Sequence, residues 1–187
     1  MAEGDRPELI AQPLEVFVAT VGTAFPDLGA EVPADWSRLG RTFPANIGED
    51  GITVQPTQEV EEFFGQSTMA VEAFRTEEGL VFTIPVADLR LETWRWVLGN
   101  DINDETIGEV AIDFERGPNT KKLALLARGL SPYDRSKQAQ FEVPVCYHSG
   151  EPEVEFSKGD PGELELEFTS LRSEAGKIRL RAEEAAA

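Results

Sequence analysis

The chain has 187 residues, enough for one domain that buries about 70% of the surface of its unfolded chain, or for two small domains. With 41% hydrophobic residues, 11 Phe and 3 Trp, the composition excludes an intrinsically disordered protein. The 35 acidic residues against 17 basic ones give a net charge of −18, which argues against a protein that binds duplex DNA through its phosphate backbone. The single cysteine, Cys146, and single histidine, His148, exclude an internal disulfide and metal cages of thiolates and imidazoles.

The two ends of the sequence are polar and predict little structure. Residues 1–13 contain two prolines and predict a flexible N-terminal segment, and residues 182–187 have no apolar face and predict a disordered C-terminal tail. The first apolar stretch is too short for a signal peptide, and no window approaches the roughly 18 apolar residues of a membrane span. We therefore expect a single domain over 14–181, with neither secretion signal nor membrane segment.

The first strand is predicted over 14–21 and ends at Gly22. The following residues, 22–51, are rich in Pro, Gly and Asp and have no helical or strand period. A segment of this length without regular structure is unusual in a compact domain and often meets a partner. Two interpretations stay open for it. Its aromatic residues fold back on the core as in an ordinary surface loop, or the segment is an arm that contacts another subunit through Trp36, Leu39 and Phe43.

Alternation of apolar and polar residues predicts strands over 52–62, 69–76 and 80–86, the last two joined by a hairpin turn at 77–79. A helix is predicted over 88–98, because Asp88 is a suitable N-cap, Leu91, Trp94 and Leu98 repeat at helical spacing, and glycine follows.

The second half of the sequence predicts further strands over 107–115, 121–128, 139–147, 163–169 and 177–181. In the strand over 139–147, Phe141, Val143, Val145 and Tyr147 are expected to point inward. The last two strands are expected to pair, glutamate face against arginine face, at roughly 0.2–1 kcal/mol per favourable cross-strand pair. With eight or nine strands and one helix, the fold class is mainly β, a sandwich or barrel with one helix packed on it.

Enzyme motifs are missing from the sequence. No Gly-x-Ser-x-Gly elbow accompanies His148, no phosphate-binding glycine loop occurs, and Cys146 has no activating partner in sequence. The oxygen-rich run at 100–105 lacks the spacing of a calcium loop and is interpreted as the solvated end of the helix. We therefore expect no catalytic residue, no metal site and no cofactor.

A family resemblance is carried by the order of several short segments. These are VATVGTAFP at 18–26, PADWSRLG at 33–40, EDGITV at 49–54, QEVEEFFG at 58–65, and the strand at 80–86 that leads into LETWRWVLG at 91–99. In this order they resemble the major tail protein, or tail tube protein, of long-tailed bacteriophages of the siphophage type. The resemblance covers 14–99 well and the rest by strand pattern. The joint at 39–51 is several residues longer than the LGYVSEDG joint often seen in that family.

The resemblance implies a β-sandwich or half-barrel subunit with one flanking helix, whose strands complete a tube-wide β-barrel on oligomerisation. Such subunits form stacked hexameric rings, the virion tail tube that conducts DNA into the host cell after assembly in the host cytoplasm. The implied partners are further copies of the chain and the tail tip or initiator, tape measure and tail terminator proteins. DNA would pass without specific binding, which suits an acidic bore because duplex DNA carries one negative charge per about 1.7 Å.

The carboxylates expected to face the lumen are those on the polar faces of the strands at 52–62 and 163–169: Glu59, Glu61, Glu163, Glu165 and Glu167. Three alternatives stay open. The subunit builds the inner tube of a contractile tail, a tailocin or a gene transfer agent. It is a monomeric β-sandwich that binds a ligand through Trp94 and Trp96, although helical spacing places Trp94 in the core. Or it is a hydrolase with two carboxylates facing across a cleft.

Overall fold

The computed structural model describes residues 14–40, 47–48, 51–66, 68–87, 93–94, 105–106, 109–110, 118–131, 137–152, 154, 163–174 and 176–182. This part of the chain is mainly β, as predicted, and its only helical residues are Thr93 and Trp94. The rest of the helix predicted over 88–98, most of the strand predicted over 107–115, and the segments 1–13 and 183–187 lie outside the described residues. Ala182, predicted to begin the tail, is instead the last residue of a strand.

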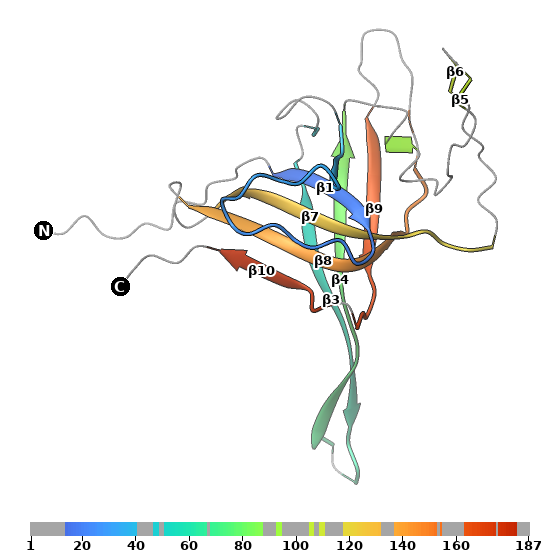
Figure 1. Cartoon of the computed structure of the whole chain (residues 1–187). Helices are drawn as coiled ribbons and strands as arrows, with labels where there is room; N and C mark the ends of the chain where they lie inside the picture. The colour runs from blue at the N-terminus through green and yellow to red at the C-terminus, as the bar shows by residue number, and fades with distance from the viewer. Residues whose placement is uncertain are drawn as a thin grey trace, which may run out of the picture.

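Eight of the described strands form one antiparallel sheet in the order β2-β1-β7-β8-β9-β4-β3, with β10 paired to β8 (Figure 1). The strands of this sheet are β1 (Glu15–Thr20), β2 (Ser37–Arg38), β3 (Thr53–Phe63), β4 (Glu72–Val86), β7 (Lys122–Leu130), β8 (Gln138–His148), β9 (Leu164–Ser170) and β10 (Arg179–Ala182). β5 (Glu105–Thr106) and β6 (Glu109–Val110) form a separate two-stranded ladder.

The sheet changes direction at β8, because β9 and β10 pair with different parts of the same edge of this strand. The end of β8 at 146–148 pairs with β9, whereas 139–142 pairs with β10. Between them lies Pro144, which has no N–H and leaves no ladder donor unpaired. On the opposite edge the register shifts between Leu123 and Leu125, a bulge that bends the strand. As a result, β1, β7 and β8 run across β4 and β9 in Figure 1.

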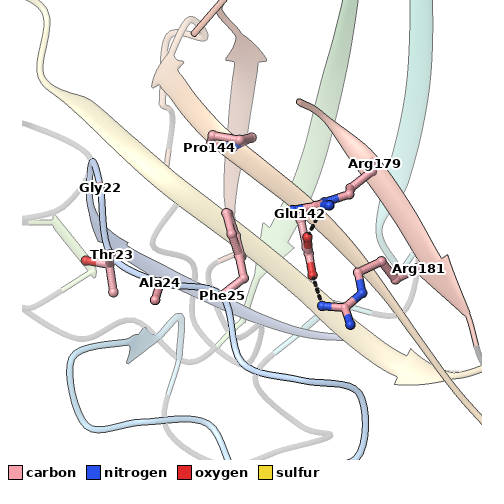
Figure 2. Close-up of a pocket in the computed structure, with 8 residues that line it drawn as sticks. All are labelled: Gly22, Thr23, Ala24, Phe25, Glu142, Pro144, Arg179 and Arg181. Atoms are coloured by element: carbon pink, nitrogen blue, oxygen red, sulfur yellow. Dashed lines mark hydrogen bonds and ion pairs between the residues drawn. The ribbon is translucent and has the colours of Figure 1, made fainter. Parts of the chain in front are cut away.

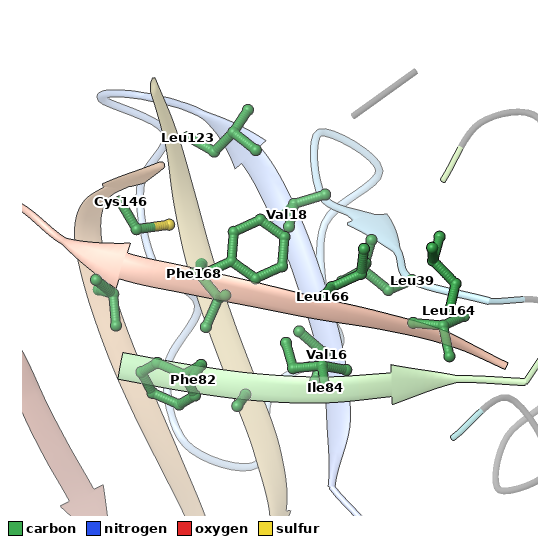
Figure 3. Close-up of a cluster of buried hydrophobic side chains, with 14 residues drawn as sticks. Val16, Val18, Leu39, Phe82, Ile84, Leu123, Cys146, Leu164, Leu166 and Phe168 are labelled. Carbon is green, nitrogen blue, oxygen red and sulfur yellow. The ribbon is translucent and has the colours of Figure 1, made fainter. Parts of the chain in front are cut away.

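The main core lies where these strands cross (Figure 3). β9 follows a strict period of two, so Leu164, Leu166 and Phe168 are buried, while the residues between them point outward. These side chains pack against Phe82 and Ile84 of β4 and against apolar residues of β1, β7 and β8. Each fully buried side chain of this size contributes about 1.5–3 kcal/mol to folding.

The bulge also corrects the predicted inward face of β8. Val143 and Cys146 belong to the main core, so the inward positions change phase between them. Val145, predicted to share the face of Val143, is buried but lies outside that cluster. An inserted residue reverses every later side chain of a strand, and an alternation pattern read through it is wrong beyond that point.

The described part of the irregular segment, 22–40, covers the other face of β1 and β7. Trp36 lies in a second apolar cluster and donates from its indole Nε1 to the Ala24 carbonyl at 3.1 Å. Its ring packs against Phe25 in a tilted arrangement, with 5.1 Å between the ring centroids. Leu39 reaches the main core. The prediction of a segment without regular structure is wrong at Ser37–Arg38, which pairs with β1 as β2.

The predicted hairpin turn at 77–79 is wrong. Strand β4 runs without interruption from Glu72 to Val86, and the hairpin partner is β3, with the turn at 64–71. Gly79 lies inside the strand, where a Cβ would come within 2.9 Å of the Thr57 hydroxyl oxygen. This glycine therefore permits a close cross-strand approach, and the positive φ of a tight turn is found at Gly65 instead.

The predicted pairing of 163–169 with 177–181 is also wrong. β9 pairs with β4 and with the end of β8, whereas β10 returns along the other part of the same β8 edge. The arginines of β10 do meet a glutamate, but it is Glu142 of β8.

Substitution of one buried and one exposed phenylalanine tests this account of the core. Phe168→Ala removes a fully buried ring and should lower the free energy of unfolding by about 3–5 kcal/mol. Phe63→Ala, at a ring that is 59% exposed on β3, should change it by less than about 0.5 kcal/mol. Urea unfolding followed by tryptophan fluorescence measures both, and equal losses in the two variants would contradict the assignment of the core.

Candidate functional site

One face of the β9-β4-β3 part of the sheet points away from the core and is polar. Phe82 and Phe168 mark the core side, so the residues alternating with them belong to the outer side. The register places there Thr53, Gln55, Thr57, Glu59 and Glu61 of β3, Glu77, Gly79, Val81, Thr83 and Pro85 of β4, and Glu165, Glu167 and Thr169 of β9, and beyond the bulge it sets Phe74 opposite Glu61. Among these residues, which we call the polar face, five are carboxylates and none is basic.

The polar face brings together residues predicted from two separate strands. Glu59, Glu61, Glu165 and Glu167 all lie on it, and Glu163 is exposed directly before β9. All of these acids are therefore surface groups of one region of the sheet. Their orientation toward a lumen stays a prediction.

The carboxylates on β9 are positioned by neighbouring loops. Ser149 donates to Glu167 Oε1 at 2.7 Å and accepts a hydrogen bond from the Thr169 hydroxyl at 2.8 Å. The Glu163 carboxylate lies against Gly48, where a Cβ would come within 2.7 Å of Oε2 and the glutamate side chain would have to shift. These contacts hold the acids of β9 in defined positions at the edge of the polar face.

The acids on the hairpin include a like-charge pair. Glu59 stands directly opposite Glu77 in the register, next to the bulge between Glu59 and Val60. Like charges directly opposite each other destabilise an antiparallel pair, by an amount comparable to the 0.2–1 kcal/mol of a favourable one. The negative charge of the polar face is thus held at a cost in stability, which favours a role other than folding.

The far end of the β3–β4 hairpin is apolar and exposed. The hairpin extends well beyond the rest of the sheet in Figure 1. Its end, which we call the hairpin tip, exposes six large hydrophobic residues: Val60, Phe63, Phe64, Met69, Val71 and Phe74. Monomeric soluble proteins rarely leave apolar side chains gathered in this way, so the tip has the character of an interaction surface.

The predicted subunit-contact residues are placed differently. Trp36 and Leu39 are covered by their own chain, as the alternative of a loop folded back on the core describes. Phe43 lies outside the described residues. For this segment the contact with another subunit stays a prediction, and the hairpin tip is the described region that exposes aromatic rings.

A buried charge network, which sequence patterns did not indicate, joins β10 to β8 (Figure 2). Glu142 is fully buried and accepts hydrogen bonds from Arg179 Nε at 2.7 Å, Arg181 NH1 at 3.0 Å and Gln140 Nε2 at 2.6 Å. Gln140 in turn accepts from Arg128, whose guanidinium also donates to the carbonyls of Asp27 and Ala30. Burial lowers the pKa of Arg128, and the hydrogen bond to Glu142 raises the pKa of Arg181.

The network borders a pocket of about 250 Å³ between β10 and the start of the 22–40 segment. Its lining includes Glu142, Arg179 and Arg181, together with Gly22–Phe25 and Pro144. Figure 2 shows both arginines pointing toward Glu142, so the charged groups of the pocket are engaged with one another. In the sequence, Gln140 and Glu142 alternate with apolar residues as on an ordinary solvent-exposed strand face, so this pattern carries no signal for the site.

Cys146 and His148 have structural surroundings. Cys146 is part of the main core, and burial raises the pKa of its thiol to about 12. His148 packs edge-to-face on Phe168 at 5.7 Å between ring centroids. A thiol with such a pKa is almost entirely protonated near neutral pH and is a poor nucleophile.

Neither a metal-binding cluster nor a membrane-spanning helix is found among the described residues. They contain no group of three or more His, Cys, Asp or Glu side chains arranged to hold a metal ion. Within the same residues, no helix has the length and apolar character needed to cross a membrane. The oxygen-rich run at 100–105 lies outside them except for Glu105.

No protein-family model matches this chain. Comparison with curated proteins likewise gives no significant match.

The raised pKa of Cys146 predicts its reactivity. Relative to a thiol with the ordinary value of 9.0, a pKa of about 12 lowers the thiolate fraction at pH 8 by about 1000-fold, so alkylation should slow by a similar factor. Iodoacetamide labelling followed by mass spectrometry, with and without urea, measures this. Equally fast labelling of the folded and unfolded protein would contradict the burial of Cys146.

The network around Glu142 predicts how β10 is held. Glu142→Ala removes the carboxylate that accepts from Arg179, Arg181 and Gln140 and should lower the free energy of unfolding by about 3 kcal/mol. Gln140 keeps its bond to the Pro26 carbonyl and Arg181 keeps its ion pair with Asp27. Glu165→Ala, at an exposed carboxylate, is the matched control and should cost less than about 0.5 kcal/mol. In Glu142→Ala, amide hydrogen exchange should accelerate more at 179–182 than in β7. Equal acceleration in the two strands would argue against a specific role of Glu142 in holding β10.

Proposed function

We propose that this protein is a structural subunit that assembles with copies of itself into a hollow tube through which DNA passes, as in the tail tube proteins that its sequence resembles. The observation that carries the proposal is the hairpin tip. Its exposed apolar residues lie at the end of the β3–β4 hairpin, which extends beyond the rest of the sheet, and the described part of the chain does not cover them. A subunit that associates with further copies gives such a surface a partner.

The polar face supports the conduit part of the proposal. A tube that passes DNA must repel the phosphate backbone, and a sheet face with five carboxylates and no basic residue among its members does so. The like-charge pair Glu59 and Glu77 fits this interpretation, because a face selected only for stability would not retain it. We place Glu59, Glu61, Glu163, Glu165 and Glu167 on the lumen side.

The finer architecture belongs to the same proposal. The crossing of β1, β7 and β8 over β4 and β9 favours a half-barrel or sandwich, flanked by the helix predicted over 88–98. In the assembled ring, strands of adjacent subunits would continue one another into a tube-wide barrel, which removes the exposed sheet edges. The location would be the virion tail. Besides further copies, the tail tip or initiator, tape measure and tail terminator proteins would be its partners.

The alternatives differ in their support. An inner tube of a contractile tail, a tailocin or a gene transfer agent would use the same surfaces. A monomeric ligand-binding sandwich would need Trp94 and Trp96 as exposed platforms. Trp94 packs against the main core, as its helical spacing predicted, and Trp96 lies outside the described residues. The described pocket presents one carboxylate held by arginines, which differs from the two facing acids of a glycoside hydrolase.

Electron microscopy of the purified protein tests the proposal. At high protein concentration and about 1 M salt, the repulsion between subunits of charge −18 is screened beyond about 3 Å, so rings or tubes should form. Their bore should be wide enough for duplex DNA. Particles that stay monomeric under these conditions, and also when assembly is seeded with a preformed tail tip, would overturn the proposal.

The hairpin tip gives a sharper form of the test. The double variant Phe63→Ser and Phe74→Ser should abolish rings and tubes while shifting the melting temperature by no more than about 2 °C, because both rings are more than half exposed. Val21→Ser, at an exposed apolar residue outside the hairpin, is the control and should assemble normally. Normal assembly of this double variant would show that the hairpin tip is not part of the contact between subunits.

A further inference from the structure

Two strands, β3 and β10, keep one edge free within the described part of the sheet. β3 pairs with β4 alone, and β10 pairs with β8 alone. Strands β4, β9 and β8 separate them in the sheet, so the two edges belong to different regions of the molecule. Free edges of this kind are templates for pairing with another chain.

The free edge of β10 is the more basic of the two. Arg179 and Arg181 point to the side of Glu142, and Lys177 precedes them at the same spacing. The residues between them are apolar and exposed, with Leu180 at 52% and Ile178 at 39%. Alternating basic and apolar side chains thus follow one another along this edge.

The free edge of β3 has the complementary pattern. Glu59 and Glu61 lie on the polar face, and Val60 lies between them on the core side of the sheet. All three are exposed. A strand with two acids on one side and an apolar residue on the other matches a strand with two arginines on one side and a leucine on the other.

The two edges also match in the side of the sheet to which their residues point. Leu180 stands opposite Phe141, which packs against the main core, so Leu180 and Val60 both point to the core side. Arg179 and Arg181 point to the outer side, as do Glu59 and Glu61. Joining β3 of one copy to β10 of another therefore continues the sheet with like sides together.

We infer that β10 is the receiving edge for β3 of a second copy of this chain, paired antiparallel about Val60 and Leu180. This register sets Glu59 beside Arg181 and Glu61 beside Arg179. Each favourable cross-strand pair of this kind adds to the main-chain hydrogen bonds of the new ladder. The inference rests on the proposed self-assembly and names the two surfaces that meet.

The charge around β10 leaves capacity for incoming carboxylates. Arg179 and Arg181 share the single buried carboxylate of Glu142, and Arg179 remains 58% exposed while it does so. A guanidinium has five N–H donors, and Glu142 takes one from each arginine. Arg181 also forms an ion pair with Asp27, with NH2 3.5 Å from Oδ1, and donors remain on both arginines. Glu59 and Glu61 would use the remaining donors and keep their places on the polar face.

The contact joins unlike surfaces, so every copy offers one β3 edge and one β10 edge. Such head-to-tail pairing produces a closed ring when the rotation between copies closes, and an open filament when it does not. It is therefore compatible with the rings of the proposed tube.

Disulfide trapping between two separately purified full-length variants tests the inference. Val60→Cys and Leu180→Cys, both at exposed positions, are mixed under assembly conditions and oxidised. Residues opposite each other in an antiparallel ladder have Cα atoms about 4.5–5.5 Å apart, within disulfide range. Disulfide-linked dimers should form at least about tenfold faster than in a mixture of Val21→Cys with Leu180→Cys.

A charge variant separates this pairing from chance collision. Adding Glu59→Lys and Glu61→Lys to Val60→Cys should reduce trapping to the control rate, while Arg179 and Arg181 still hold Glu142. The buried Cys146 is common to all variants and should not react.

Each outcome decides between the two proposals. Rings or tubes without trapping above the control would overturn the β3–β10 contact and leave the tube function standing. Trapping in a protein that never forms rings or tubes would support the contact and overturn the tube. Absence of both would overturn both, and trapping that is insensitive to the lysine changes would overturn the predicted charge pairing.

Discussion

The division of one edge of β8 between two partners is the constraint on which the fold depends. β9 can pair with only a few residues of β8 before Pro144 and the bulge in the β7 ladder turn the strand away. That divergence lets β4 and β9 cross β1, β7 and β8 and enclose the main core. It also leaves the remaining β8 edge open, where β10 covers the main-chain groups and Glu142 anchors it.

The elements predicted correctly from sequence are those with an undisturbed period of two. The alternation at 163–169 gives both the strand and its buried face, and the strand at 14–21 is likewise found with small shifts in its ends. The strand at 80–86 is found as the second half of the longer β4. Strand partners were predicted less well. The glycine at 79 suggested a turn, but its role is a close approach to Thr57, which becomes apparent only once the partner strand is known.

The candidate site divides in the same way. Alternation placed four acids of the polar face on the polar side of their strands, whereas Glu77 was predicted to lie in a turn. The orientation of these acids toward a lumen stays a prediction. The network around Glu142 was not predicted, since it unites residues of β8, β7, β10 and the 22–40 segment, far apart in the chain. Aromatic residues in 22–40 looked available for a partner, but Trp36 is occupied by Phe25 and Ala24 of its own segment.

Strand β4 also has a mechanical consequence. It runs unbroken for 15 residues, about 50 Å, from the exposed end of the hairpin into the main core. Tension applied along the hairpin therefore reaches the core without passing through a loop that would absorb it. Its last six residues are held in register by β9, whose ladder lies across the direction of pull, so these hydrogen bonds are loaded together rather than one after another. The hairpin is thus anchored so that force applied at its far end is transmitted to the centre of the subunit.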